Sequence, residues 1–158
     1  MFNLRKRVKQ LTNLTYKEWQ ILLLSLVTLP IVGLALNIKN YQWTSSKLKR
    51  SVASIAPSIL PLDIQAEESQ IVARMVFIAA NHGLYRANCL KKSLVIWWLL
   101  ARAGIPTDLK IGIRKADEVF AAHSWVEAFG TVLVDHPDVN QTYQPITGIS
   151  DLQYARFE

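Results

Sequence analysis

The chain has 158 residues, 51% of them apolar, which is enough to form one small hydrophobic core. Its formal net charge of +6 is concentrated at the front: residues 1–50 hold nine Lys and Arg against one acid, whereas residues 51–158 hold nine against eleven. The basic residues lack the aromatic interleaving and the motifs of nucleic-acid readers, which argues against nucleic acid and favours anionic lipid or an acidic partner.

The first predicted element is an apolar helical stretch within a basic N-terminal region, residues 1–60. No charged residue occurs between Trp19 and Ile38, a stretch of about 20 residues that is sufficient to span a bilayer. The basic residues before it would keep the N-terminus cytoplasmic. Pro30 and Gly33, however, disfavour one long helix. Three interpretations are therefore open: a membrane span, a helix at the membrane surface, and a helix or helical pair that covers the rest of the chain.

A linker and an amphipathic helix follow. Residues 56–63 contain two prolines and are typical of a linker. Residues 64–81 are predicted to form a helix with Ile71, Met75 and Ile78 on one side.

Cys89, the only cysteine, lies at the start of the next predicted helix. Asn88 is a favourable N-cap residue, Gly104 is favourable just beyond the C-terminus, and Pro106 prevents continuation. The free backbone N–H groups and the macrodipole at a helix start favour the thiolate form of a cysteine. Because one cysteine can form no internal disulfide, Cys89 serves either packing, as a small buried hydrophobe, or chemistry.

The last predicted elements are strands that carry a histidine and an aspartate. Residues 108–114 and 119–128 are typical of strands, and so are residues 131–135. His123 lies within the second strand, and Asp135 ends the third.

The loop between these two strands decides whether the histidine and the aspartate meet. A three-residue loop, 128–130, would place Glu127 opposite Thr131 and His123 opposite Asp135 on the same face. A two-residue loop would instead place them on opposite faces. The alternative is a histidine satisfied in the core and an unrelated aspartate at a strand end.

Cysteine, histidine and aspartate in this order match the parts of a thiol-nucleophile enzyme. The sulfur attacks, the imidazole takes its proton, and the carboxylate orients the imidazole. The remaining histidines fit this scheme less well: His82 is expected in a turn, and His136 and Asp138 flank Pro137 at a strand end or in a loop. One cysteine and three scattered histidines give no ligand spacing, so neither a metal nor another cofactor is expected.

Five short motifs follow one another between residues 88 and 135. They are Cys89-Leu90-x-x-Ser93-Leu94, Leu100-x-x-x-Gly104-Ile105-Pro106, Ile111-Gly112-Ile113-Arg114-Lys115, His123-Ser124-Trp125-Val126-Glu127 and Asp135. Together they resemble the catalytic region of the leader peptidases of lasso-peptide biosynthesis, which belong to the transglutaminase-like cysteine enzymes. The resemblance implies that Cys89 is the nucleophile, His123 the general base and Asp135 the group that orients it. The family usually has Ala where this chain has Ser124, a small-for-small change expected to face away from the rung that His123 and Asp135 share.

The resemblance also implies a fold and a reaction. The fold is α+β: a papain-like or transglutaminase-like core in residues 61–158, in which the cysteine helix packs on a small antiparallel sheet. The reaction is removal of the leader from a ribosomally made precursor peptide through an acyl-enzyme, before a separate asparagine-synthetase-like cyclase that uses ATP closes the ring. Residues 1–60 read as helix rather than as the strands and winged helix of a leader-binding domain. A separate leader-binding protein is therefore expected to present the precursor.

A cytosolic precursor implies a cytoplasmic enzyme. A span through residues 19–38 would place Cys89 on the other side of the membrane, so we expect this segment to pack on the catalytic domain or to contact the membrane surface. Two other functions stay open: acyl transfer of the transglutaminase or acyltransferase type, and a membrane-associated interaction module without catalysis.

Overall fold

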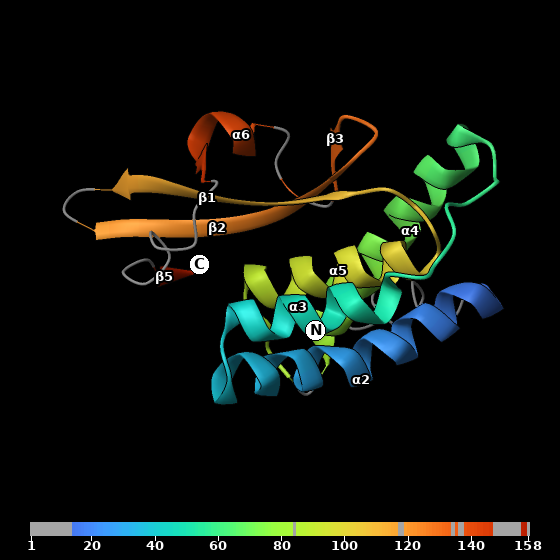
Figure 1. Ribbon diagram of the computed structural model, residues 1–158, viewed down its shortest axis with the longest axis horizontal. Coiled ribbons are helices and arrows are strands. Elements are labelled where there is room, and N and C mark those ends of the chain that lie inside the picture. Colours follow the sequence, from blue (N-terminus) through green and yellow to red (C-terminus); the bar gives the residue numbers. More distant parts are fainter. Residues whose placement is uncertain are drawn as a thin grey trace, which may run out of the picture.

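The computed structural model describes residues 14–146, apart from positions 84, 117–118, 134 and 136–137, together with residues 156–157. The helices are α2 (Tyr16–Ile38), α3 (Tyr41–Val52), α4 (Leu62–His82), α5 (Cys89–Arg102) and the short α6 (Val139–Thr142). The strands are β1 (Asp108–Ala116), β2 (Val119–Ala128), β3 (Thr131–Val132), β4 (Gln144–Pro145) and β5 (Arg156–Phe157). Figure 1 shows the sheet on one side of the helices and α2 on the far side. The expected α+β fold is confirmed.

Helix α2 runs unbroken although Pro30 lies inside it. It begins with a capping box, in which Thr15 and Glu18 each accept the other's backbone N–H. Gly33 lies where the ring of Tyr85 approaches, and a Cβ at this position would be 1.9 Å from the Tyr85 Oη atom. Of the two arrangements left open, one helix or a helical pair, the single helix is therefore the one that forms across Pro30 and Gly33. Packing against the rest of the chain outweighs the local cost of an interior proline, about 3 kcal/mol.

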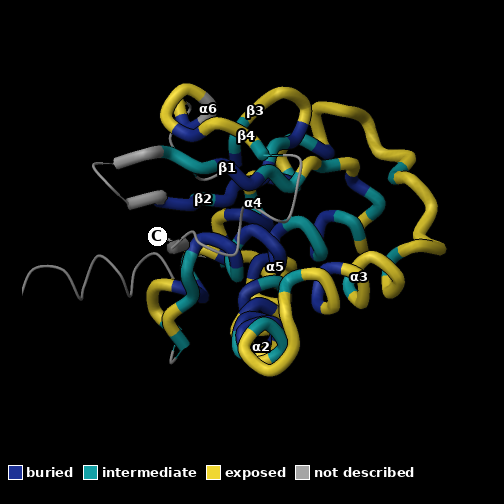
Figure 2. The backbone as a smooth tube through the Cα atoms, turned by 60° about the vertical axis from the view of Figure 1, so that its left-hand side comes forward, coloured by how far each residue is buried: buried dark blue, intermediate teal, exposed yellow. Residues whose placement is uncertain are grey.

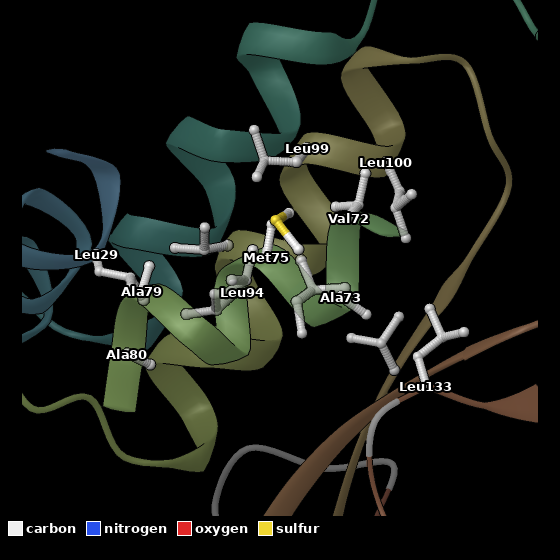
Figure 3. Packing of buried hydrophobic residues seen from close by; sticks show 14 of the residues in the cluster. Leu29, Val72, Ala73, Met75, Ala79, Ala80, Leu94, Leu99, Leu100 and Leu133 are labelled. Atoms are coloured by element: carbon white, nitrogen blue, oxygen red, sulfur yellow. The ribbon is translucent and has the colours of Figure 1, made fainter. Parts of the chain in front are cut away.

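The main hydrophobic core lies between α2, α4 and α5 and extends to the sheet (Figure 3). Met75 of α4 and Leu94 of α5 are fully buried in it, and Leu29 reaches it from α2. Met75 thus lies on the inner side of its helix as expected, whereas Ile71 and Ile78 lie half-buried at the margins of that side. The N-terminal helices and the elements that follow therefore share one core.

The inner side of α2 is docked on this core. Leu22, Leu29 and Val32 are buried, and each such burial contributes about 1.5–3 kcal/mol. Glu18 is also buried, and its carboxylate forms an ion pair with Arg74 of α4. Among the described residues, α2 is also the one helix long and apolar enough to cross a membrane, with 33% of its most apolar window buried in the domain.

The connection between α3 and α4 is held against the end of α5. Residues 53–61 form no helix, and α4 begins at Leu62, so the linker expected at 56–63 ends slightly earlier. The Ser58 N–H donates to the Gly104 carbonyl at 2.8 Å. Gly104 has a φ of +72° just beyond α5, the left-handed conformation expected of it.

The sheet has the strand order β3-β2-β1-β4, and β5 pairs in parallel with β2. Strands β1 and β2 form a long antiparallel pair that runs from Asp108 opposite Glu127 to Ala116 opposite Val119. In this register Gly112 lies opposite His123.

The hairpin between β2 and β3 differs from the expected one. Its loop has two residues, Phe129 and Gly130, with φ of 52° and 75°, so that Ala128 lies opposite Thr131. The prediction of a three-residue loop is wrong because Phe129 adopts the left-handed conformation, which the sequence pattern assigned to the glycine alone. The third strand also ends at Val132 rather than at residue 135.

Candidate active site

Cys89 is the first residue of α5, as the sequence predicts. The side-chain oxygen of Asn88 accepts the Lys91 N–H at 3.2 Å and caps the helix. The remaining free N–H groups of the first turn lie beside the thiol, where they favour a negative charge. Only 4% of Cys89 is exposed.

His123 lies in the middle of β2 between two aromatic rings. Its ring centroid is 6.3 Å from that of Trp125, with the planes 17° apart, and 5.1 Å from that of Tyr143. These rings have room because Gly112 is the residue opposite His123. A Cβ at Gly112 would lie 2.9 Å from Trp125 and from Tyr143. The histidine ring is therefore oriented by packing as well as by hydrogen bonds.

Asp135 contacts His123 directly: its Oδ2 atom lies 2.6 Å from the His123 Nε2. The two residues are not partners across a strand pair, so the predicted route to this contact is wrong. The Leu133 N–H still donates to the Val126 carbonyl at 2.9 Å, and beyond it the chain leaves the ladder in a bend. If the ladder continued after the two-residue turn, Asp135 and His123 would lie on opposite faces of the sheet. Because the chain leaves the ladder, Asp135 reaches His123 all the same.

Cys89 meets His123 at an open edge of β2. On this edge β3 pairs with residues 127–128 and β5 with residues 121–122, and no described strand pairs with the positions between them. The first turns of α5 fill the gap. The Ser93 hydroxyl donates to the Ser124 carbonyl at 2.8 Å, and the Oγ atoms of the two serines lie 3.3 Å apart. Both serines are buried.

Ser124 was expected to face away from the rung that His123 and Asp135 would share, and it nevertheless contacts the Cys89 thiol. Its hydroxyl and its backbone N–H both form hydrogen bonds with the Cys89 thiol. Strand alternation does place the Ser124 side chain on the face opposite that of His123, but this is the face on which α5 packs. Strand alternation in the sequence predicts on which face Ser124 lies. It does not predict that α5 packs on that face and brings Cys89 to Ser124.

The site favours a thiolate and an imidazolium. The hydrogen bond to Asp135, followed by that to Cys89, raises the pKa of His123 to about 9. Burial by itself raises the pKa of the Cys89 thiol, but the hydrogen bonds from His123 and Ser124 outweigh it, so that this pKa lies below its ordinary value. Both shifts favour transfer of the proton from the sulfur to the imidazole, which makes the sulfur more nucleophilic.

The space in front of the sulfur is small. A cavity of about 130 Å³ opens at the site, and its lining includes Cys89, His123, Asp135, Phe77 and Lys92. Pockets that enclose whole ligands usually measure about 300–1,000 Å³. A larger cavity of about 520 Å³ lies between α2 and α4, and none of the three catalytic candidates lines it.

The rival residues lie elsewhere. His82 is the last residue of α4 rather than part of a turn. Asp138 is exposed at the start of α6, and His136 lies outside the described residues. No group of three His, Cys, Asp or Glu side chains in the described part of the chain is arranged to hold a metal ion.

Comparison with known proteins assigns most of the chain to a family. The family model of the transglutaminase-like superfamily matches residues 32–148, about three quarters of the chain. The match includes Cys89, His123 and Asp135 and leaves the first part of α2 outside. No curated protein and no solved structure matches the chain.

Proposed function

This chain belongs to the transglutaminase-like superfamily, and on that premise we propose that it is a cysteine peptidase that removes the leader from a lasso-peptide precursor before cyclisation. The superfamily includes cysteine peptidases and acyltransferases. The observation that carries the proposal is the contact of Cys89, at the start of α5, with a His123 that Asp135 holds at 2.6 Å. The motifs shared with the leader peptidases support the choice of substrate.

The first half of the reaction forms an acyl-enzyme. The Cys89 thiolate attacks the carbonyl carbon of the last leader residue, and the carbonyl oxygen becomes an oxyanion that the backbone N–H of Cys89 stabilises at the helix start. The His123 imidazolium then donates its proton to the amine nitrogen as the peptide bond breaks. The core peptide leaves with a free N-terminus, and the leader is held as a thioester on Cys89.

The second half releases the leader. Neutral His123 takes a proton from a water molecule, which attacks the thioester carbonyl, and the leader leaves as a free carboxylic acid. Asp135 keeps the imidazole in one orientation through both halves, because its carboxylate fixes the Nε2–H and leaves Nδ1 for the sulfur.

The small cavity supports dependence on a separate leader-binding protein. A space of about 130 Å³ holds only a few atoms of a peptide beside the scissile bond, so little of the binding free energy that selects one precursor arises there. The described residues from 14 to 60 form helices and a connection and offer no strand edge for a peptide. A partner that holds the leader would raise its effective concentration to about the millimolar range.

Two further partners belong to the proposal. The precursor peptide is the substrate, and an asparagine-synthetase-like cyclase consumes the freed core peptide by joining its N-terminus to an acidic side chain. The enzyme itself is proposed to work in the cytoplasm without a bound cofactor.

Acyl transfer is the second candidate, because the same thioester can be resolved by an amine instead of water. The two reactions differ in the leader product. Hydrolysis gives a free carboxylic acid, and transfer gives an amide adduct with a different mass. Mass spectrometry of the released leader therefore distinguishes them.

The test of the proposal uses the full chain, the precursor encoded beside its gene and the small leader-binding protein. We expect Cys89→Ala to stay folded by circular dichroism and to release no leader, while Asp138→Asn cleaves as the unaltered chain does. Cleavage by folded Cys89→Ala would overturn the assignment of the nucleophile. Without the leader-binding protein we expect slow cleavage at low micromolar precursor. Full activity there would instead show that the helical front end recognises the leader itself.

A further inference from the structure

Helix α2 presents a continuous apolar side to solvent. The side chains on this side recur at steps of three or four residues, which places them on one face of the helix. We call this set the outer stripe: Leu23, Val27, Ile31, Leu34 and Ile38, with exposed fractions of 56, 57, 60, 60 and 65%. Figure 2 shows α2 end-on at the margin of the molecule, with exposed residues facing outward. Single exposed hydrophobic residues are normal, but an apolar row along a whole helix marks a contact surface.

The outer stripe is a permanent feature of the folded domain. The opposite side of α2 is fixed by Leu22, Leu29 and Val32 in the core, and the ion pair of Glu18 with Arg74 ties its start to α4. A helix on the surface of a water-soluble domain is polar on its outer side, whereas α2 is apolar on both. Because a membrane span would have to leave the core, the partner of the outer stripe meets α2 from outside.

The exposed charges that follow the outer stripe in the chain are positive. Exposed cations follow α2 directly and continue along α3: Lys39, Lys47, Lys49 and Arg50. Within residues 14–53 the one acid, Glu18, is buried and paired with Arg74, and Lys17 pairs with Glu68 of α4. Trp43 of α3 is 43% exposed, and the Lys47 ammonium lies 5.6 Å from its ring centroid. Tryptophan and basic side chains together are typical of surfaces that meet lipid headgroups.

We propose that α2 and α3 dock on the surface of a membrane that contains anionic lipid. Helix α2 lies flat, with its outer stripe at the boundary between headgroups and acyl chains, and the cations contact lipid phosphates. A second copy of the chain is a poorer partner, because it would bring the same cations together. The sheet lies on the side of the molecule opposite α2, so the docked enzyme keeps β2, the strand that contains His123, away from the lipid (Figure 1). This proposal does not depend on the reaction at Cys89.

The test is binding of the full chain to sedimented vesicles of phosphatidylcholine, with and without one quarter phosphatidylglycerol. The stripe variant is Val27→Gln/Ile31→Gln/Leu34→Gln. The matched control replaces three exposed apolar residues outside α2: Ile55→Gln/Ile59→Gln/Leu62→Gln, with exposed fractions of 44, 99 and 69%. The charge variant is Lys47→Gln/Lys49→Gln/Arg50→Gln. All are checked for folding by circular dichroism.

We expect the unaltered chain to bind the anionic vesicles at least tenfold more strongly than the neutral ones. The stripe variant and the charge variant should each lose about tenfold or more, and the matched control should bind as the unaltered chain does. Sodium carbonate should release the bound protein, since α2 lies on the membrane and does not cross it.

Several outcomes would overturn the proposal. The proposal is wrong if the chain binds both vesicle types equally or does not bind at all. It is also wrong if the matched control loses as much binding as the stripe variant. Resistance to carbonate would show a span instead. Light scattering could reveal a dimer that the stripe variant dissociates, which would identify a second copy as the partner. If the stripe variant unfolds, the charge variant and the comparison of the two lipid compositions still test whether the chain docks on anionic membranes.

Discussion

Replacement of Asp135 by Asn should remove the charge that keeps His123 protonated while keeping the size of the side chain. The hydrogen bond that His123 donates to Asp135 is the largest contribution to the His123 pKa of about 9. In the limit that this pKa returns to its ordinary value near 6.5, the imidazolium fraction at pH 8 falls from about 90% to about 3%, a loss of about 30-fold. The Asn side chain can also turn its amide towards Nε2, which orients the imidazole wrongly.

The sign of the pH effect follows from the two roles of the imidazolium. It stabilises the Cys89 thiolate and later protonates the leaving amine, so activity is lost as pH rises through the pKa of His123 and as pH falls through that of Cys89. In Asp135→Asn the alkaline limit should move down from about 9, and the acid limit should move up because a neutral imidazole supports the thiolate less. The active range therefore narrows from both sides.

The assay for ionisation needs no substrate. Cys89 is the only cysteine, so the rate of iodoacetamide alkylation, followed by mass spectrometry from pH 5 to 10, reports its thiolate alone. Turnover of precursor, measured separately, should fall by several powers of ten, since the same change in a serine-protease triad costs roughly 10⁴. The matched control is Asp138→Asn, an exposed aspartate at the start of α6. The reasoning is refuted if alkylation and turnover are unchanged in Asp135→Asn, or if Asp138→Asn loses as much.

Two further changes probe the surroundings of the triad. Ser124→Ala removes a hydroxyl that forms a hydrogen bond with the thiol and keeps the backbone N–H. The Cys89 pKa should therefore rise, and alkylation at pH 6 should slow severalfold with little change in Tm. An equal effect of Ser46→Ala, a change at an exposed serine, would contradict this. Gly112→Ala places a Cβ 2.9 Å from Trp125 and Tyr143, which should destabilise the fold by about 1–3 kcal/mol and lower turnover through the displaced histidine. Thermal unfolding measures the stability of this variant, and precursor cleavage measures its turnover. A Gly112→Ala protein with normal Tm and turnover would show that the rings of Trp125 and Tyr143 are not needed to hold His123.

The cysteine helix was predictable because its determinants are local. Asn88, Gly104 and Pro106 mark its ends through backbone geometry that depends little on the rest of the fold. The three candidate catalytic residues could also be named, since an unpaired cysteine followed by a strand histidine and an aspartate is a small set in a short chain. Their roles stay predictions until the variants are measured.

The geometry that joins them could not be predicted from local pattern. The register of the hairpin depends on whether Phe129 adopts a positive φ, and the Asp135 contact depends on where the chain leaves the ladder after Leu133. The direction of Ser124 was predictable, but its contact with Cys89 required the position of α5. For α2, the outcome at Pro30 depended on burial that only the tertiary structure supplies.

The open edge of β2 has a consequence for solubility. Unpaired N–H and C=O groups on a strand edge pair readily with strands of other molecules and seed aggregation. Here the Ser93 hydroxyl satisfies the Ser124 carbonyl, and the thiol of Cys89 takes the neighbouring N–H. The start of α5 therefore also blocks strand pairing along the edge of β2, the strand that contains His123. A substitution that displaces the start of α5 from β2 should therefore make the protein prone to self-association in the cell as well as inactive.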